Sequence, residues 1–158
     1  MAILGSQIGQ IEADEAAMIS KVFQLNDLTA KDLMTPRVAA PTLPGRVSLQ
    51  SVKSNLLENN STWWVVLGEE VDKVVGVANR EKLLTSLLRG DSHLTPYELS
   101  ENVEFVPEMI RVDRLLLGFN EDKNGVRVVV DEFGGFVGLI GAEAVLAVLA
   151  GWWRKSNK

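Results

Sequence analysis

The sequence repeats one order of secondary structure. Residues 47–84 and 112–146 each indicate a helix, a strand, a tight turn, a second strand and a second helix. Gly76 and Gly138 occupy the same place in the two copies, 62 residues apart. One copy of roughly 40 residues is too small to bury a stable core by itself. The repeat therefore predicts two units that pack together as a pseudo-symmetric module.

Apolar periodicity gives the expected elements of each copy. In the first copy they are a helix at 48–57, strands at 63–67 and 73–78, and a helix at 80–88. In the second copy they are a helix at 112–120, a strand at 126–130, a turn at 131–135, a strand at 136–140 and a helix at 141–150. We predict an α+β fold of two β-α-β-β-α repeats packed through their sheets.

A further helix is expected before the repeats. Residues 13–25 place Ala16, Ile19 and Val22 on one apolar face. The predicted division of the chain is an N-terminal helix and linker at 1–31, a first repeat at 32–92, a second repeat at 93–151 and a tail at 152–158.

Composition excludes several functions. The net charge of -5 and a pI near 4.9 leave no basic surface, so we expect no nucleic-acid partner. The absence of cysteine excludes a disulfide scaffold and thiol catalysis. The one histidine, His93, cannot supply a histidine zinc site and is expected in a solvated turn. Because no acid–base pair or activated nucleophile can be assembled, we predict that the protein is not an enzyme.

No apolar run reaches the roughly 20 residues that a membrane-spanning helix needs. The longest, at 144–153, is too short, so we expect the chain as given to be soluble. The acidic pairs Glu69-Glu70 and Asp131-Glu132 lie in turns between strands, where solvated carboxylates are usual. We therefore predict no metal site.

The segment at 32–37 has two interpretations. Pro36 forces Thr35 toward extended geometry, so the segment cannot continue a helix. It is either a connector between a helix and a strand, or a loop that presents Thr35 and backbone groups to a ligand.

Two motifs carry a resemblance to a known family. They are Leu33-Met34-Thr35-Pro36-Arg37, after the helix that includes 15–25, and the run 128–135 followed by Val137-Gly138-Leu139. Together they resemble the tandem CBS-domain (Bateman) region of CorC/HlyC-type magnesium and cobalt efflux proteins, over about residues 10–151. The resemblance implies a cytoplasmic regulatory module, tethered at the inner face of the cell membrane through a membrane-embedded transport domain in the full-length protein.

The resemblance also implies an adenine nucleotide, AMP or ATP, between the repeats, with magnesium only as a nucleotide complex. The residues expected at the first cleft are Thr35, Pro36, Arg127, Val137, Gly138, Leu139, Gly141 and Glu143. Those expected at the second cleft are Val106, Pro107, Asn79 and Lys82. Elementary chemistry agrees with this expectation, because free N–H groups at a helix N-terminus favour phosphate or ribose oxygens.

Arg127 and the tryptophan pair at 63–64 each have two interpretations. Arg127 either holds a phosphate through charge-assisted hydrogen bonds or is an ordinary solvated arginine at a strand end. Trp63 and Trp64 either stack on a ligand or fill the core and interface, and the second interpretation is the more common for tryptophan pairs.

The sequence departs from the family pattern at the ribose positions. Gly141 stands where a threonine is expected, and Ala144 and Lys82 stand where aspartates are expected. Loss of a carboxylate contact to ribose would weaken binding roughly ten- to a hundred-fold. A structural homodimerisation module with degenerate nucleotide sites is therefore the alternative to a nucleotide sensor.

The last helix favours a partner chain. Residues 142–150 are apolar on nearly every side, so such a helix needs cover on more than one face. We predict a homodimer with this helix at the interface. The alternative is that Trp152 and Trp153 face a further domain or a membrane surface.

Overall fold

The computed structural model describes residues 28–70, 73–119 and 124–156. The helix predicted at 13–25 lies outside the described residues. In the part of the chain that is described, no helix combines the length and apolar character needed to cross a membrane.

The first repeat forms a three-stranded sheet in the order β2-β3-β4. β2 runs parallel to β3, and β3 runs antiparallel to β4. The elements of this unit are β2 (Thr42–Pro44), α3 (Leu49–Glu58), β3 (Trp63–Leu67), β4 (Val74–Asn79), α4 (Arg80–Leu88) and α5 (Pro96–Leu99).

The second repeat forms a four-stranded sheet in the order β1-β7-β6-β5. Its elements are α2 (Ala30–Leu33), β1 (Thr35–Pro36), β5 (Glu104–Pro107), α6 (Val112–Phe119), β6 (Val126–Val130), β7 (Phe136–Gly141) and α7 (Ala142–Ser156). The short strand β1 precedes the first repeat in sequence but pairs with β7 of the second. The chain therefore crosses from one unit to the other directly after residue 36.

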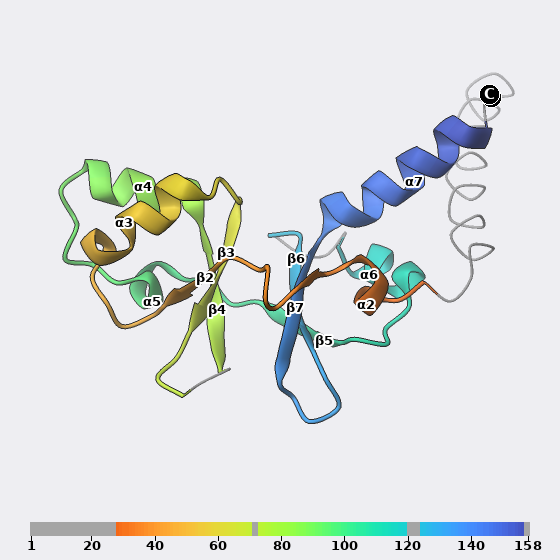
Figure 1. Ribbon diagram of the computed structural model, residues 1–158, viewed down its shortest axis with the longest axis horizontal. Helices are drawn as coiled ribbons and strands as arrows, with labels where there is room; N and C mark the ends of the chain where they lie inside the picture. The colour runs from red at the N-terminus through yellow and green to blue at the C-terminus, as the bar shows by residue number, and fades with distance from the viewer. Residues whose placement is uncertain (1–27, 71–72, 120–123, 157–158) are drawn as a thin grey trace, which may run out of the picture.

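The two sheets lie next to each other at the centre of the molecule, with the helices of each unit on its outer side (Figure 1). A buried cluster joins them, with Val65 and Val77 of the first sheet beside Val126 and Val128 of the second. Each unit also has its own core between sheet and helices. The predicted α+β fold of two repeats packed through their sheets is confirmed.

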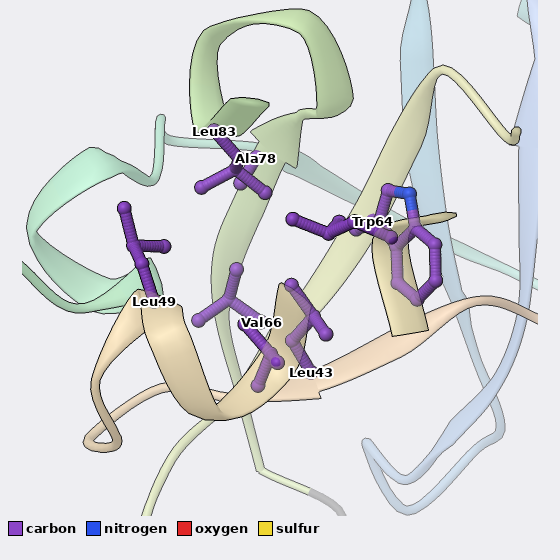
Figure 2. Packing of buried hydrophobic residues seen from close by; sticks show 8 residues of the cluster. Leu43, Leu49, Trp64, Val66, Ala78 and Leu83 are labelled. Carbon is purple, nitrogen blue, oxygen red and sulfur yellow. The ribbon is translucent and has the colours of Figure 1, made fainter. Parts of the chain in front are cut away.

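Trp64 belongs to the core of the first unit. Figure 2 shows it among the side chains packed between this sheet and its helices, where it is 3% exposed. Its indole Nε1 donates a hydrogen bond to the Ser61 carbonyl oxygen at 3.0 Å. The polar edge of the ring is therefore satisfied inside the core, and the interpretation of Trp64 as core filler is confirmed.

The repeated glycines lie where a second backbone segment pairs with β7 in one sheet and with β4 in the other. A Cβ atom on Gly138 would lie 2.8 Å from the Thr35 carbonyl oxygen, and one on Gly76 would lie 2.5 Å from the Glu101 carbonyl oxygen. Both distances are too short for a side-chain carbon. Glycine is thus required at both positions because the carbonyl oxygen of the paired backbone lies too close for a side chain.

His93 is exposed in a turn between α4 and α5, as predicted. The predicted strands and helices of both repeats start and end within one or two residues of the observed ones, except that α7 extends to Ser156. The interpretation of 32–37 as a helix-to-strand connector describes its backbone correctly, since α2 ends at Leu33 and β1 begins at Thr35.

Candidate functional site

A cavity of about 350 Å³, here called the inter-repeat pocket, opens between the two units. Its walls come from three parts of the chain. The segment around β1 contributes Thr35, Ala39 and Pro41, the start of the first sheet contributes Asn60, Ser61, Thr62 and Trp63, and the second unit contributes Val126, Leu139, Gly141, Glu143 and Ala144. A ligand bound here would touch both repeats and the connection between them.

The wall from the first unit is held by its own hydrogen bonds. The Asn59 side-chain oxygen, at the end of α3, accepts hydrogen bonds from the Ser61 N–H at 2.9 Å and the Ser61 hydroxyl at 2.7 Å. The Thr62 carbonyl oxygen accepts one from the Arg80 N–H at 2.8 Å. These bonds, with the indole bond to the Ser61 carbonyl, fix the loop at 60–62 as a preorganised surface.

The wall from the second unit includes the start of α7. Gly141 precedes this helix and has no side chain that could accept a hydrogen bond from the first turn. The Ala142 N–H donates to the Gly125 carbonyl oxygen at 2.9 Å. The following N–H groups of the first turn have no partner four residues earlier within the helix, so they are suited to a ligand oxygen.

The equivalent helix of the first unit is capped differently. The Asn79 side-chain oxygen accepts hydrogen bonds from the Glu81 N–H at 2.9 Å and the Lys82 N–H at 3.3 Å. This side chain occupies the position that a ligand oxygen would take at α4. The two pseudo-symmetric helix starts therefore differ, because α4 is capped by the Asn79 side chain and α7 is preceded by a glycine, which has no side chain.

The residues predicted at the first cleft are only partly brought together. Thr35, Leu139, Gly141 and Glu143 line the inter-repeat pocket. The other members of β1 and β7 hold the strands in register instead: Pro36 pairs with Gly138, and the Val137 carbonyl oxygen accepts a hydrogen bond from the Arg37 N–H at 2.8 Å. Ala144, at the position of the missing carboxylate, also lines the pocket.

Arg127 is not brought to the pocket. Its neighbour Val126 lines the pocket, and alternation along β6 turns Arg127 to the opposite face, beneath α6. It is 3% exposed, so the interpretation as a solvated arginine is wrong. Its Nε atom lies 3.3 Å from a Glu104 carboxylate oxygen, and its guanidinium lies over the Phe119 ring. The phosphate contact of Arg127 stays a prediction.

The residues predicted at the second cleft do not lie together but occupy two separate parts of the structure. Asn79 and Lys82 line a shallow hollow on α4 together with Thr85. Val106 is buried in the core of the second unit, and Pro107 ends β5 in the same sheet. In the first repeat, the residue that corresponds structurally to Thr35 is neither Val106 nor Pro107.

That counterpart is Glu101. It forms an antiparallel bridge with Val77, as Thr35 pairs with Leu139. The loop at 60–62 was not predicted, because it lies outside the motifs around residues 35 and 138 that carry the family resemblance. The available signal was the polar run of Asn60, Ser61 and Thr62 at the end of the first helix of the repeat, directly before an apolar strand.

The acidic turns do not gather into a metal site among the described residues, where no group of three or more candidate ligands lies together. Asp131 instead stabilises its own turn, because its carboxylate accepts hydrogen bonds from the Phe133 N–H at 2.9 Å and the Gly135 N–H at 2.8 Å. Gly134 in this turn has a φ of 83°, which favours glycine.

Comparison with known proteins gives relatives over most of the chain. A UPF0053 protein of Synechocystis sp. is 43% identical over 151 residues, which are 96% of this chain and 44% of that protein. The magnesium and cobalt efflux protein CorC of Vibrio cholerae is 31% identical over 144 residues, 89% of this chain and 48% of CorC. The chain spans less than half the length of these curated relatives. No family model matches the chain.

Solved structures identify the fold. A CBS domain of the bacterial CNNM/CorC family Mg²⁺ transporter in complex with ATP has a TM-score of 0.77 and 30% identity, covering 87% of this chain and 98% of that chain. A second structure of a CBS domain of this family has a TM-score of 0.74 and 30% identity, covering 92% of this chain and 88% of that chain. The two packed repeats are therefore a pair of CBS domains. The chain belongs to the CNNM/CorC family, of which it represents the CBS-domain region.

Proposed function

We propose that this chain is the regulatory CBS pair of a magnesium or cobalt transport protein and that it binds an adenine nucleotide in the inter-repeat pocket. The observation that carries the proposal is the pocket itself, which joins Thr35, the preorganised loop at 60–62 and the start of α7. The related CBS domain in complex with ATP supports an adenine nucleotide as the ligand.

Regulation would follow from the position of the pocket. A ligand that touches both repeats stabilises the relative arrangement of the repeats in which all its contacts are made. Such a ligand biases an attached domain only by its difference in affinity between two arrangements. In the parent protein the attached partner would be the membrane-embedded transport domain, with the CBS pair on the cytoplasmic side.

The proposal includes one nucleotide per chain. Asn79 caps α4 with its own side chain, whereas Gly141 leaves the start of α7 open to a ligand. We therefore expect a single site, at the inter-repeat pocket, and no second site at Asn79 and Lys82.

Calorimetric titration of AMP, ADP and ATP, each with and without magnesium, tests this function. We expect one site per chain and at least a ten-fold loss of affinity in Gly141→Asn, because the new side chain would cap α7 as Asn79 caps α4. A Cβ at position 141 would meet only the Gly125 carbonyl oxygen, at 3.9 Å, so the variant should fold. Absence of heat and of thermal stabilisation at millimolar nucleotide would refute the proposal.

A specific observation favours homodimerisation as a second function. α7 extends away from the two sheets (Figure 1), and its Leu146 side chain is 55% exposed while Val145 is buried. Leu88, at the end of the equivalent helix α4, is 89% exposed. Exposed leucines on these two helices are suited to contact with a second copy of the chain.

Light scattering after size exclusion tests the dimer. Leu146→Glu should convert it to a monomer, because a charge would be buried in an apolar interface. Leu117→Glu is the matched control, since Leu117 is 68% exposed on α6. A monomeric wild-type chain at high micromolar concentration would exclude this function.

A further inference from the structure

The last strand on one side of the four-stranded sheet, β5, carries exposed apolar side chains. Phe105 is 48% exposed, and Met109, in the turn that follows β5, is 66% exposed. The β6–β7 turn begins beside this strand, because Pro107 pairs with Val130, the last residue of β6. In that turn Phe133 is 89% exposed. This surface, here called the β5 edge patch, consists of Phe105, Met109 and Phe133.

The β5 edge patch is separate from the inter-repeat pocket, and none of its three residues lines that pocket. β6 contributes Val126, its first residue, to the pocket, whereas Val130, its last residue, leads into the turn of Phe133. Four residues along a strand span about 13 Å. The β6–β7 turn also projects from the end of the sheet opposite to α7 (Figure 1). A partner on the patch would therefore leave the pocket accessible.

The two turns of the patch are held by their own hydrogen bonds. The Pro107 carbonyl oxygen accepts one from the Ile110 N–H at 3.0 Å. In the β6–β7 turn the Asp131 N–H donates to the Gly135 carbonyl oxygen at 2.9 Å, and the Asp131 carboxylate accepts two further bonds. The apolar tips are therefore preorganised, so that binding a partner costs little conformational freedom.

The first unit has polar residues at the corresponding positions. Thr42 begins the parallel pairing of β2 with β3 where Phe105 takes part in that of β5 with β6. Arg46 follows the proline that ends β2 by two residues, as Met109 follows the proline that ends β5. The β3–β4 turn begins with the sequence at 68–70, whose third residue is an exposed glutamate. The apolar patch is thus particular to the second unit and is not required by the fold.

The charge around the patch is acidic. Residues 107–110 and 131–135 contain Glu108, Asp131 and Glu132 but no Lys or Arg. Lys31 lies beside the first of these turns, because its N–H donates to the Glu108 carbonyl oxygen at 2.9 Å. One lysine does not balance three carboxylates. The patch therefore combines exposed apolar side chains with negative charge.

This combination selects among possible partners. An anionic lipid surface calls for about four to eight clustered Lys and Arg residues, which the two turns do not have. A second copy of the chain docked through the same patch would bring like carboxylates together. Residues 1–27 contain four acidic residues and one lysine, so this segment has the wrong charge as well. The matching partner is a segment that carries both apolar and Lys or Arg side chains.

We propose that the β5 edge patch docks on a basic, apolar segment of the transport domain of the parent protein. This inference rests on the proposed function, under which the CBS pair is attached to a membrane-embedded domain. Cytoplasmic loops close to membrane-spanning helices carry an excess of Lys and Arg, so they have the required charge. Three side chains form a small interface, which suits a reversible contact rather than a permanent one.

Photo-crosslinking in the full-length parent protein tests the contact. Phe133 is replaced by p-benzoylphenylalanine, and the membranes are irradiated. We expect crosslinks to a Lys- or Arg-bearing cytoplasmic segment of the transport domain, identified by mass spectrometry of the joined peptides. The same replacement of Leu57, which is 60% exposed on α3 of the first unit, is the control and should not capture that segment.

A charge reversal tests the complementarity. Glu132→Lys should lower the crosslink yield from position 133 about three-fold or more, because it repels a basic segment. Glu69→Lys is the matched control, since Glu69 is an exposed glutamate in the corresponding turn of the first unit, and it should leave the yield unchanged. Both variants of the chain should keep the wild-type melting temperature within about 2 °C, because substitutions of exposed residues change stability little.

The outcomes separate this inference from the proposed nucleotide function. Crosslinks from position 133 only to lipid, to a second copy of the chain or to residues 1–27, or no crosslink at all, would overturn the inference. An equal loss of yield in Glu132→Lys and Glu69→Lys would also overturn it. Calorimetry with AMP and ATP reads the nucleotide function independently. Nucleotide binding without capture of the transport domain refutes the docking alone, whereas capture without nucleotide binding supports the docking and refutes nucleotide sensing.

Discussion

The guanidinium carbon of Arg127 lies 4.9 Å from the centroid of the Phe119 ring. The same group lies beside the Glu104 carboxylate, and its Nη1 atom donates to the Val126 carbonyl oxygen at 3.1 Å. These contacts join β5, β6 and α6 on the outer face of the second sheet. The strand end that supplies Val126 to the inter-repeat pocket is thus supported from behind by a buried arginine.

We expect Arg127→Met to lower the free energy of unfolding by about 1 to 3 kcal/mol, because methionine fills part of the space but loses the buried hydrogen bond to the Val126 carbonyl oxygen and the ion pair with the exposed Glu104. Ligand affinity of the folded variant should stay within two-fold. Denaturant unfolding and calorimetry measure the two effects. Arg114→Met, an exposed position on α6, is the control and should stay within about 0.5 kcal/mol. A ten-fold loss of affinity at unchanged stability would instead place Arg127 on the phosphate.

A second prediction concerns the pairing of β1 with β7. Gly138→Ala would place a carbon 2.8 Å from the Thr35 carbonyl oxygen, so the two backbones must separate. We expect a loss of about 1 to 3 kcal/mol of stability together with weaker ligand binding, because Thr35 lines the pocket.

Gly76→Ala is the comparison for this prediction. It should destabilise the first unit for the same reason, through the Glu101 carbonyl oxygen at 2.5 Å, but leave ligand affinity of the folded protein unchanged. Thermal unfolding and titration of both variants give the result. Equal losses of affinity in the two variants would show that the effect is general destabilisation rather than movement of Thr35.

The repeat and its elements could be predicted because both cores are built from local patterns that the sequence displays directly. The amphipathic helices and the β-rich runs around Val65 and Val128 are examples. The face of Arg127 could not be predicted in this way. Strand β6 is buried on both sides, so its apolar residues do not show which face meets the helices and which meets the other sheet.

The walls of the pocket were harder to predict for a different reason. Thr35 and Gly141 share a pocket only because β1 leaves the first repeat and pairs with the second. The loop at 60–62 reaches the same pocket only through the packing of one sheet on the other. Such contacts are non-local, and no periodicity in the chain specifies them. Resemblance to a family supplied Thr35, Leu139, Gly141 and Glu143, whereas Ser61 and Thr62 required the structure.

A third prediction concerns the cap of α4. Asn79→Ala removes the acceptor for two N–H groups and should cost about 1 kcal/mol, whereas Asn79→Ser should retain most of the stability. Denaturant unfolding measures both. Neither variant should change the stoichiometry or affinity at the inter-repeat pocket, because Asn79 lies outside it. Appearance of a second binding event in Asn79→Ala would show that the side chain had been blocking a second site.

The last prediction separates the two adjacent tryptophans. Trp63 lines the pocket and is half-buried, so Trp63→Leu should weaken binding of adenosine and AMP about ten-fold, the equivalent of roughly 1.4 kcal/mol, through loss of aromatic contact with the base. Trp64 is 3% exposed in the core, so Trp64→Leu should lower stability by about 2 to 4 kcal/mol and leave the affinity of the folded fraction close to the wild type. Titration below the unfolding transition, with thermal melts of both variants, distinguishes these effects. If Trp63→Leu kept full affinity, the base would have to bind against Val126 and Leu139 instead, and the aromatic wall would serve only to close the pocket.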